Sequence, residues 1–463
     1  MRVRVVVTSI AVVTVVSLVL AGSPAEAAVP KTPDKITSVT AGPGPRVGEI
    51  TIRWKSGGHN TTGYDVETAL TAFSKSTASP LPWTGRNSHH FRVGGSKRSI
   101  TLSAKQTKAA GAGAGSGNHL FFRVTALNQS QQKTTTRAYG PLLGVMAKPA
   151  APKARGTNLR VASFNVRSAR NRTDARPWLK RAGDVAAEIK HANADVVALQ
   201  ELSPGRADGR SGASTEAVPR QTDHLLRALA KIKAKKYRLV RTTSYIKPGA
   251  THGGQGARIL YNSSQLSLVS RCANTTGKQA YSTACSFSLP IAKGDTAADR
   301  RSATYAEFKD KESGKRFLLV SVHLDFRQSP DPTLARKYNA LRGRQMAAVH
   351  AKIGKVRRGN EPVIVAGDYN AWQNQQTGDA PHDYLVGKGY DDAAAAQSTV
   401  KRNYPTYNGF KRVIAPSQQG FGNRLDNILV KGLQGSRRYA NVTRVADSAR
   451  PSDHNLIYAD LAL

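Results

Sequence analysis

Hydrophobic and polar positions divide the chain into two parts with different patterns. Between residues 33 and 147, short runs alternate apolar and polar residues, are separated by turn-forming residues and show no helical period. Such runs are typical of β-strands that bury one face. The clearest examples are Ile50–Trp54, Gly63–Glu67, Ser99–Leu102 and Phe122–Asn128. The pattern predicts an all-β sandwich for residues 33–147, with residues 109–117 (AAGAGAGSG) as a loose insertion.

The pattern changes after residues 148–157, a Pro/Ala/Lys-rich stretch that we expect to be a semi-extended linker. Helical spacing of apolar residues predicts helices at Trp178–His191, Thr222–Ile232 and Ala340–Ile353. Apolar strands are predicted at Leu159–Phe164, Ala194–Leu199, Ala257–Tyr261, Ser302–Phe308, Arg316–Leu324, Pro362–Ala366, Leu425–Val430 and Asn455–Leu461. Strands mixed with separated helices favour an α/β or α+β domain over residues 158–463, built from two packed sheets.

The first 27 residues have the pattern of a signal peptide. Arg2 and Arg4 precede an apolar run, Val5–Leu20, and Ala25–Ala27 has the small-x-small form of a cleavage site. The apolar run is short and is interrupted by Thr and Ser, which argues against a membrane anchor. We therefore expect a mature chain that starts near Ala28 and is secreted to the extracellular space, without a transmembrane segment.

Cysteine usage agrees with export. The sequence contains two cysteines, Cys272 and Cys285, which are close together in the chain. In an oxidising compartment they are expected to form one local disulfide. No histidine lies near them in the sequence, which argues against a metal site.

The net charge of the chain indicates the charge of its binding partner. The chain has 69 Lys and Arg against 30 Asp and Glu, a formal net charge of +39. The excess is widespread, because residues 28–150 alone have 16 Lys and Arg against 4 Asp and Glu. Such a charge favours nucleic acid, anionic lipid or an acidic polymer as partner. It can also serve solubility or retention at a cell wall, so charge gives only the sign of the partner.

Polar side chains recur where the predicted strands of the second part end. In chain order they are Asn165, Glu201, His323, Asp368, Asn370, Asp426, Asp453 and His454. Each one alone could be a turn or cap residue. Oxygen donors without cysteine or clustered histidine favour Mg²⁺, Mn²⁺ or Ca²⁺ over zinc, and histidine carries a proton near neutral pH. Together they predict a metal-dependent phosphoester hydrolase in which water attacks in line.

Six short motifs carry these residues: S-F-N, L-Q-E, H-L-D, G-D-Y-N, R-L-D-N-I and S-D-H. Their order resembles that of the endonuclease/exonuclease/phosphatase superfamily, which includes pancreatic-type deoxyribonuclease, abasic-site endonucleases, sphingomyelinases and inositol-phosphate phosphatases. The resemblance covers residues 158–463 and implies a deoxyribonuclease I-like two-sheet α/β sandwich. The strands of residues 33–147 resemble a fibronectin type III domain, with Trp54, Tyr64 and Leu102 as core markers.

The resemblance also implies a metal site. Glu201 resembles the principal metal ligand of the superfamily, and Asn165 and Asp453 would complete the metal environment. The ion would be Mg²⁺, with Mn²⁺ or Ca²⁺ as alternatives.

Five further residues acquire implied roles in the reaction. His454 resembles the catalytic imidazole, oriented and kept basic by Asp426. His323 resembles a second histidine that contacts the scissile phosphate and protonates the leaving oxygen. Asp368 and Asn370 would position the attacking water and a phosphate oxygen. The resemblance leaves open whether the aspartate or the histidine activates the water.

The leading interpretation of the substrate is nucleic acid, DNA before RNA. The positive charge and the polar loop Ser203–Arg220, expected to be flexible, support it. The first alternative is a sphingomyelinase-like or small-molecule phosphodiesterase, for which Tyr404–Tyr407 and Phe410 would be a membrane-side or a substrate-side loop. The second alternative is a catalytically silent protein that binds polyanions. The N-terminal domain would contact cell wall, polysaccharide or protein, or would act as a spacer.

Overall fold

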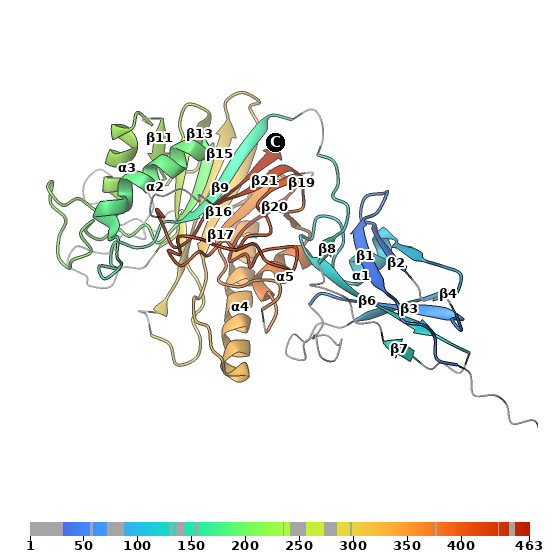
Figure 1. Cartoon of the computed structure of the whole chain (residues 1–463). Coiled ribbons are helices and arrows are strands. Elements are labelled where there is room, and N and C mark those ends of the chain that lie inside the picture. Colours follow the sequence, from blue (N-terminus) through green and yellow to red (C-terminus); the bar gives the residue numbers. More distant parts are fainter. Residues whose placement is uncertain are drawn as a thin grey trace, which may run out of the picture.

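The computed structural model describes residues 31–463 except 56–58, 72–87, 130–132, 136–143, 153–155, 235, 241–255, 273–284, 297–298, 376, 434 and 444–449. The predicted signal peptide lies outside the described residues. Among the helices that are described, none combines the length and the apolar character needed to cross a membrane. The chain forms an N-terminal β part and a larger α/β part that lie side by side (Figure 1).

Two small sheets form the β part. One contains β1 (Ser38–Pro43), β2 (Ile50–Lys55) and β5 (Ser99–Leu102); the other contains β4 (His89–Gly94), β3 (Gly63–Ala69), β6 (His119–Leu127), β7 (Lys133–Thr135) and β8 (Val145–Met146). Both sheets contribute to one hydrophobic core that includes Ile52, Trp54, Tyr64 and Phe122. The predicted strands are confirmed, and the assignment to the fibronectin type III family stays a prediction.

Two expectations for the β part are wrong. A short helix, α1 (Ala104–Ala109), follows β5, because Ser103 and Gln106 form a capping box that the apolar pattern does not reveal. Residues 109–117 are not a loose insertion. The carbonyl oxygen of Gly115 accepts a hydrogen bond of 2.6 Å from the backbone N–H of Asp392, which ties this segment to the α/β part.

Two mixed sheets packed face to face form the α/β part, as predicted. The strand order of the first is β11 (Tyr237–Leu239), β12 (Arg258–Asn262), β10 (Val196–Gln200), β9 (Asn158–Asn165), β22 (Leu456–Ala462), β21 (Ser436–Val442) and β19 (Ala396–Val400). The order of the second is β13 (Leu266–Leu268), β15 (Ser302–Asp310), β16 (Arg316–His323), β17 (Val363–Asp368), β20 (Asp426–Lys431) and β18 (Asp391–Asp392), and β14 (Ser286–Ser288) also pairs with β15. Val161, Ile259, Leu319 and Ile457 belong to the core between the sheets.

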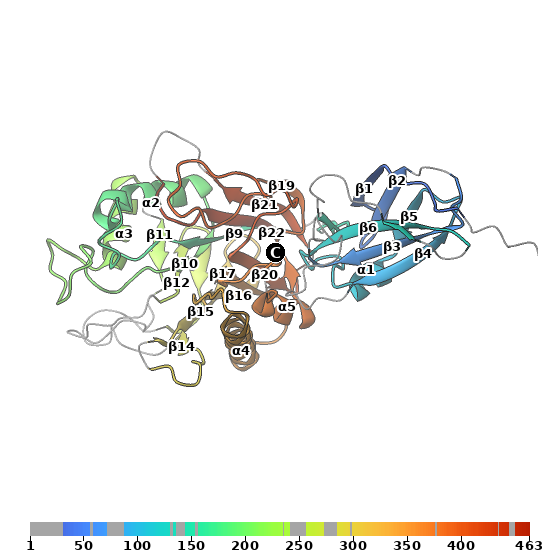
Figure 2. The same cartoon turned by 60° about the horizontal axis from the view of Figure 1, so that its bottom comes forward.

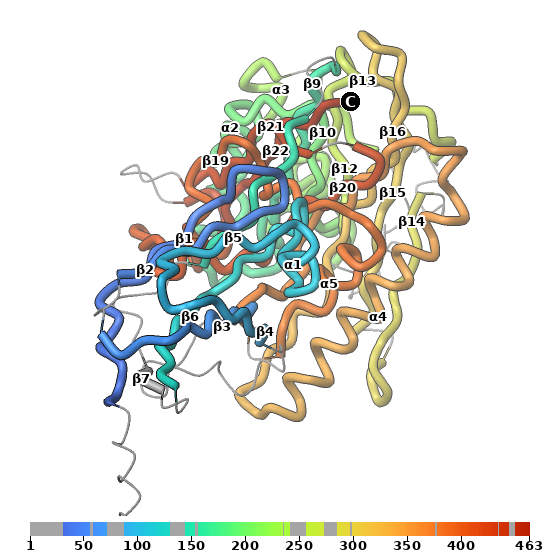
Figure 3. Tube along the Cα trace, turned by 90° about the vertical axis from the view of Figure 1, so that its right-hand side faces the viewer, coloured from blue at the N-terminus to red at the C-terminus, as the bar shows by residue number. Residues whose placement is uncertain are grey.

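Helices cover the outer faces of both sheets (Figure 2). The first sheet carries α2 (Trp178–Ala192) and α3 (Gln221–Lys231), and the second carries α4 (Pro332–Val356) and α5 (Ala380–Gly387). The helices α2 and α3 are found within one residue of their predicted bounds. α4 begins eight residues earlier than predicted, because the Asp331 side chain caps it and Pro332 occupies its first turn. In Figure 3 the molecule is seen from the side of the β part.

One topological feature brings the polar strand ends together. Each sheet contains one parallel pair joined by a helix: α2 joins β9 to β10, and α4 joins β16 to β17. The last residues of each pair lie opposite one another, Asn165 beside Gln200 and His323 beside Asp368. Because β9 packs against β17 and β10 packs against β16, both pairs end at the same edge of the sandwich.

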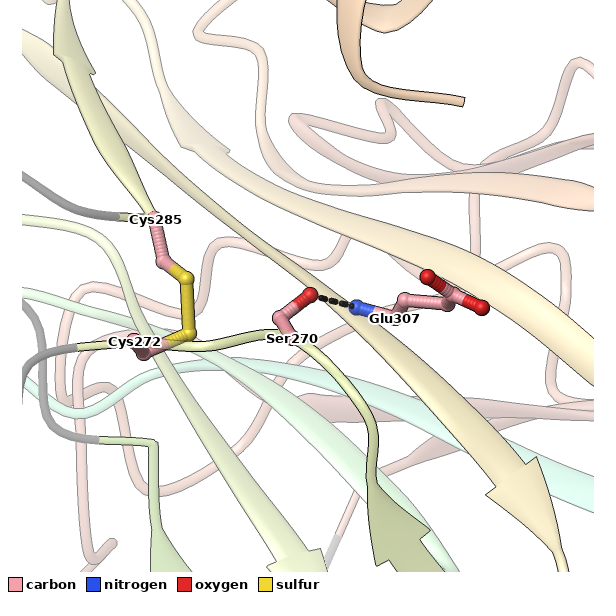
Figure 4. Close-up of a disulfide and its surroundings, with 4 residues drawn as sticks. All are labelled: Ser270, Cys272, Cys285 and Glu307. Atoms are coloured by element: carbon pink, nitrogen blue, oxygen red, sulfur yellow. Dashed lines mark hydrogen bonds between the residues drawn. A yellow bond between two sulfur atoms is a disulfide. The ribbon is translucent and has the colours of Figure 1, made fainter. Parts of the chain in front are cut away.

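The predicted disulfide is confirmed. Cys272 and Cys285 are bonded, with their Cα atoms 5.3 Å apart (Figure 4). Beside it, the hydroxyl of Ser270 accepts a hydrogen bond of 2.7 Å from the backbone N–H of Glu307 in β15. The two contacts fasten the chain after β13 to the edge of the second sheet.

Replacing both cysteines (Cys272→Ser with Cys285→Ser) should lower the free energy of unfolding by about 3 kcal/mol, because the bond restricts a short loop of the unfolded chain. Urea unfolding of the oxidised wild type, the reduced wild type and the double variant measures this. The reduced wild type should match the variant. An unchanged free energy of unfolding in the variant would contradict the prediction.

Candidate active site

A pocket of about 590 Å³ opens at the edge of the sandwich where the parallel strands end. Six of the eight sequence-predicted site residues line it: Glu201, His323, Asp368, Asn370, Asp453 and His454. The other two, Asn165 and Asp426, are buried behind the lining and form hydrogen bonds with it. The structure therefore brings all eight residues into one constellation.

Three non-glycine residues of the pocket have a left-handed backbone. Their φ angles are 58° for Arg167, 59° for Glu201 and 52° for Asn370. Each follows a strand by one or two residues, at the point where the chain turns across the pocket. This conformation costs about 1 kcal/mol or more for a residue with a Cβ, and it is concentrated at functional sites. The surrounding contacts must therefore hold these turns in place.

Asp368, at the end of β17, is the central group of the pocket. Its Oδ2 accepts a hydrogen bond of 3.1 Å from the Asn165 side chain, which comes from the facing sheet. Its Oδ1 accepts a hydrogen bond of 2.9 Å from the backbone N–H of Asn370. Burial raises the pKa of the Asp368 carboxyl to about 7, and the adjacent Asp426 carboxylate acts in the same direction.

Two histidines flank the same Asp368 oxygen. Nε2 of His323 lies 3.5 Å from Oδ2 of Asp368, and Nε2 of His454 lies 3.7 Å from it. Nδ1 of His454 and Oδ2 of Asp426 form a hydrogen bond of 2.8 Å. Burial alone would lower the pKa of His454, but Asp426 and Asp368 together raise it to about 10, so the imidazole is protonated at neutral pH.

The residues expected to bind metal are linked to Asp368 through Asn165. Nδ2 of Asn165 is 3.3 Å from Oε1 of Glu201, and Asp453 forms an ion pair of 3.0 Å with Arg167. Burial raises the pKa of Asp453. Arg167 thus supplies positive charge beside Asp453.

The donor atoms fit a divalent cation. Asp368, Asp426 and His454 offer ligand atoms that all lie within 4.8 Å of one another. Glu201 and Asp453 provide a second acidic group in the same pocket. Both sets are dominated by carboxylate oxygens, which suit Mg²⁺, Mn²⁺ or Ca²⁺. A cation would also offset the cost of burying the Asp368 and Asp453 carboxylates.

Sequence reasoning missed two buried arginines that hold the loops of the pocket. Arg181 of α2 donates hydrogen bonds to the backbone oxygens of residues 166, 167 and 451. Arg342 of α4 donates to the backbone oxygens of residues 325 and 327. Burial lowers the pKa of both to about 10. The available signal is an arginine on the apolar face of a helix, since Arg181 lies three residues after the buried Trp178.

Aromatic residues surround the mouth of the pocket, and only one of them was singled out from the sequence. Tyr407 lines the pocket and packs edge-on against His454, with ring centroids 5.1 Å apart. Phe326 and Trp372 line it as well, and Phe326 is 60% exposed. The Tyr404–Tyr407 segment is therefore a loop on the pocket side.

Comparisons with known proteins agree with the six motifs. The model of the Endonuclease/Exonuclease/phosphatase family matches residues 162–454. No protein with a curated description matches the chain. One similar solved structure is a family protein from Bacteroides thetaiotaomicron, with 22% identity, a TM-score of 0.47, and coverage of 66% of this chain and 98% of that chain.

Two other solved structures show a comparable likeness. A mannosyl-6-phosphatase of the same bacterium has 21% identity and a TM-score of 0.47, with 66% of this chain and 100% of that chain covered. TDP2 of D. rerio, in complex with a single-strand DNA product, has 18% identity and a TM-score of 0.41, with the same coverage of 66% and 100%.

In the metal-free protein, Asp426→Asn should lower the pKa of His454 by about 1–3 units, because burial then acts without its closest opposing carboxylate. NMR titration of ¹³C-labelled histidine measures the shift. Asp453→Asn is the matched control: it removes a neighbouring carboxylate that is not hydrogen-bonded to the imidazole, and it should shift the pKa less. An unchanged pKa of His454 in Asp426→Asn would show that the pair does not set the charge of the imidazole.

Proposed function

The chain belongs to the endonuclease/exonuclease/phosphatase family, and from this membership we propose that it hydrolyses phosphodiester bonds of nucleic acid, DNA before RNA. The observation that carries the proposal is the Asp368 carboxylate, buried at the bottom of an open pocket between two histidines. Family membership makes the protein a phosphoester hydrolase, and Asp368, Asp426 and His454 form a candidate site for a divalent metal. The nucleic-acid substrate is the proposed step beyond that.

The reaction can be written with the chain's own groups. A water molecule beside Asp368 attacks the phosphorus, and its proton passes to the Asp368 carboxylate, whose pKa of about 7 suits proton transfer near neutral pH. The protonated His454 donates a hydrogen bond to a phosphate oxygen and offsets its charge. The bond between phosphorus and the leaving oxygen breaks, and that oxygen takes a proton from the imidazolium form of His323, which the proton held by Asp368, 3.5 Å away, then restores. Asn370 orients a second phosphate oxygen.

A divalent cation, held by Glu201 and Asp453 with Asn165 beside them, would neutralise phosphate charge when bound. We assign it to this side of the pocket because Nδ1 of His454 is already engaged by Asp426. Because of that hydrogen bond, Nε2 is the one nitrogen of the imidazole that remains to contact either a metal ion or the phosphate.

Charge and aromatic side chains support a nucleic-acid substrate. A net charge of +39 attracts a phosphate backbone. Tyr407 and Phe326 line the pocket and are 48% and 60% exposed, and an unpaired base that stacks on such a ring gains about 1–3 kcal/mol. The Ser203–Arg220 loop, expected to be flexible, is folded back on itself by a 2.8 Å hydrogen bond from Ala207 N–H to the oxygen of Pro219.

One observation favours a second candidate. A concave pocket of about 590 Å³ lies within the usual range for small-ligand sites. It would accept a compact phosphoester as readily as one nucleotide of a strand. A small-molecule phosphodiesterase is therefore the alternative that the same experiment must separate from a nuclease.

We also propose that the protein is exported. The signal-type N-terminus motivates this, and the Cys272–Cys285 disulfide supports it, because such bonds persist in oxidising compartments. N-terminal sequencing of protein recovered from the medium of cells that express the whole chain should give a start near Ala28.

Purified protein should nick or digest plasmid DNA in the presence of Mg²⁺, Mn²⁺ or Ca²⁺ and lose that activity in EDTA. The parallel substrates are single-stranded DNA, RNA, sphingomyelin and a phosphomonoester, each with and without the ions. DNA digestion that survives EDTA would overturn the metal dependence. Hydrolysis of lipid or of a small phosphoester without cleavage of nucleic acid would overturn the substrate.

His454→Ala should lower kcat by about 10²–10³-fold, the usual range for removal of a hydrogen-bond donor that stabilises charge in the transition state, with an unchanged circular dichroism spectrum. For the metal, Mn²⁺ binding measured without substrate by isothermal titration calorimetry separates the two ligand sets. Glu201→Gln should weaken binding more than Asp426→Asn. The reverse order would place the ion on the Asp368, Asp426 and His454 side.

A further inference from the structure

We propose that the β part positions the substrate pocket of the α/β part, and that Gln373 transmits this effect to the pocket wall. The proposal rests on the proposed function for its kinetic consequence, and on the contacts between the two parts for its structural one. It replaces the expectation that the β part is only a spacer or an adhesive module. In Figure 1, β8 lies on the side of the β part that faces the α/β part, near α5.

Gln373 directly follows Trp372, which lines the pocket, and it lies five residues after Asp368. Its side chain is buried and points away from its own part of the molecule. Nε2 donates hydrogen bonds to the backbone oxygens of His119 (2.9 Å) and Leu70 (3.1 Å), and Oε1 accepts one from the backbone N–H of His119 (3.1 Å). Both polar atoms of this side chain are therefore satisfied by the β part.

The loop between β19 and β20, residues 401–425, makes a second contact. The ring of Phe421 stacks on His119 with centroids 4.5 Å apart, and the backbone oxygen of Gln419 accepts a hydrogen bond of 2.6 Å from Gly144 N–H. The same loop supplies Tyr407 and Leu425 to the pocket lining. Two segments that line the pocket, the one after β17 and the 401–425 loop, thus contact the β part.

Asp392 makes the third contact. Its backbone N–H binds the oxygen of Gly115, and a Cβ added at Gly117 would lie 2.1 Å from its Oδ2. The Asp392 carboxylate is buried and forms ion pairs with Arg424 (2.6 Å) and His382 (3.0 Å). Arg424 lies one residue before the pocket-lining Leu425. The glycine-rich segment of the β part therefore contacts Asp392, and Asp392 in turn binds Arg424 near the end of the 401–425 loop.

Because Gln373 is buried, loss of the contact with the β part would affect the pocket loop. If the β part moved away, the Gln373 amide would lose both of its partners and the loop would have to expose or refold it. Trp372 is covalently next to that amide, so its place in the wall depends on the contact. His119 takes part through its backbone and the face of its ring. Burial lowers the pKa of its imidazole, and the two ring nitrogens have no hydrogen-bond partner in the described residues.

The experiment compares full-length wild type, Gln373→Ala and Gln373→Glu. The Glu variant keeps the size and the acceptor for His119 N–H, but it places a carboxylate against two carbonyl oxygens, so it should be at least as harmful as Ala. The matched control is Gln106→Ala, which removes the side-chain half of the capping box of α1, the 2.9 Å hydrogen bond from Ser103 N–H to Oε1 of Gln106, and leaves the contacts of Gln373 in place. The control shows whether lower stability of the β part alone has the effect that we assign to loss of the Gln373 contact.

With bis(4-nitrophenyl) phosphate as substrate, the Gln373 variants should raise KM about fivefold to tenfold and change kcat less than about twofold, since they disturb the wall and leave Asp368 and both histidines in place. Hydrogen–deuterium exchange should increase at residues 369–375 and 401–425. Gln106→Ala should show neither effect.

Unchanged exchange in both loops would overturn the proposal, and so would increased exchange without a change in KM. An equal rise of KM in Gln106→Ala would reduce the effect to general stability and overturn it as well. If no phosphoester is hydrolysed at all, the proposed function fails while the exchange measurement still decides whether the β part orders the two loops.

Discussion

The buried carboxylate of Asp368 is the constraint on which the rest of the site depends. A buried carboxylate must be matched by hydrogen-bond donors or positive charge, and here the partners come from different parts of the fold. Asn165 reaches it from the facing sheet, and His323 and His454 approach it from two other strand ends. Its protonation is therefore sensitive to how the two sheets pack. A shift between the sheets would alter its distances to Asn165 and His454, which lie at strand ends of the first sheet, and would leave His323 beside it in the second.

The fold holds this arrangement by using one device twice. In each sheet a helix joins two parallel strands, and in each case a buried arginine of that helix binds backbone oxygens of the loop that follows the first strand. Arg181 and Arg342 thus fasten the chain just beyond Asn165 and His323. A guanidinium group suits this task, because it donates several hydrogen bonds in fixed directions and keeps its charge when buried. The left-handed turn at Arg167 is held by such a contact.

The strand ends of the α/β part could be predicted because apolar runs stop there and are followed by residues with distinctive chemistry. The disulfide could be predicted because the chain has two cysteines. β21 was missed because Arg437 and Arg438 interrupt its apolar pattern, and Phe326 was missed because one aromatic residue in a loop carries no periodic signal. The pocket wall required the structure, since it depends on contacts between residues that are far apart in the sequence.

Residues 109–117 show why low sequence complexity is a poor guide to looseness. Alanine and glycine give no amphipathic period, so the segment resembles an insertion when only the sequence is considered. Gly115 and Gly117 have φ angles of 80° and 70°, and added Cβ atoms would clash with Asp391 and Asp392. Small residues are needed there because two backbones approach closely, which a longer side chain would prevent. The feature that hides the segment from sequence patterns is the same one that lets the β part reach the loops of the pocket.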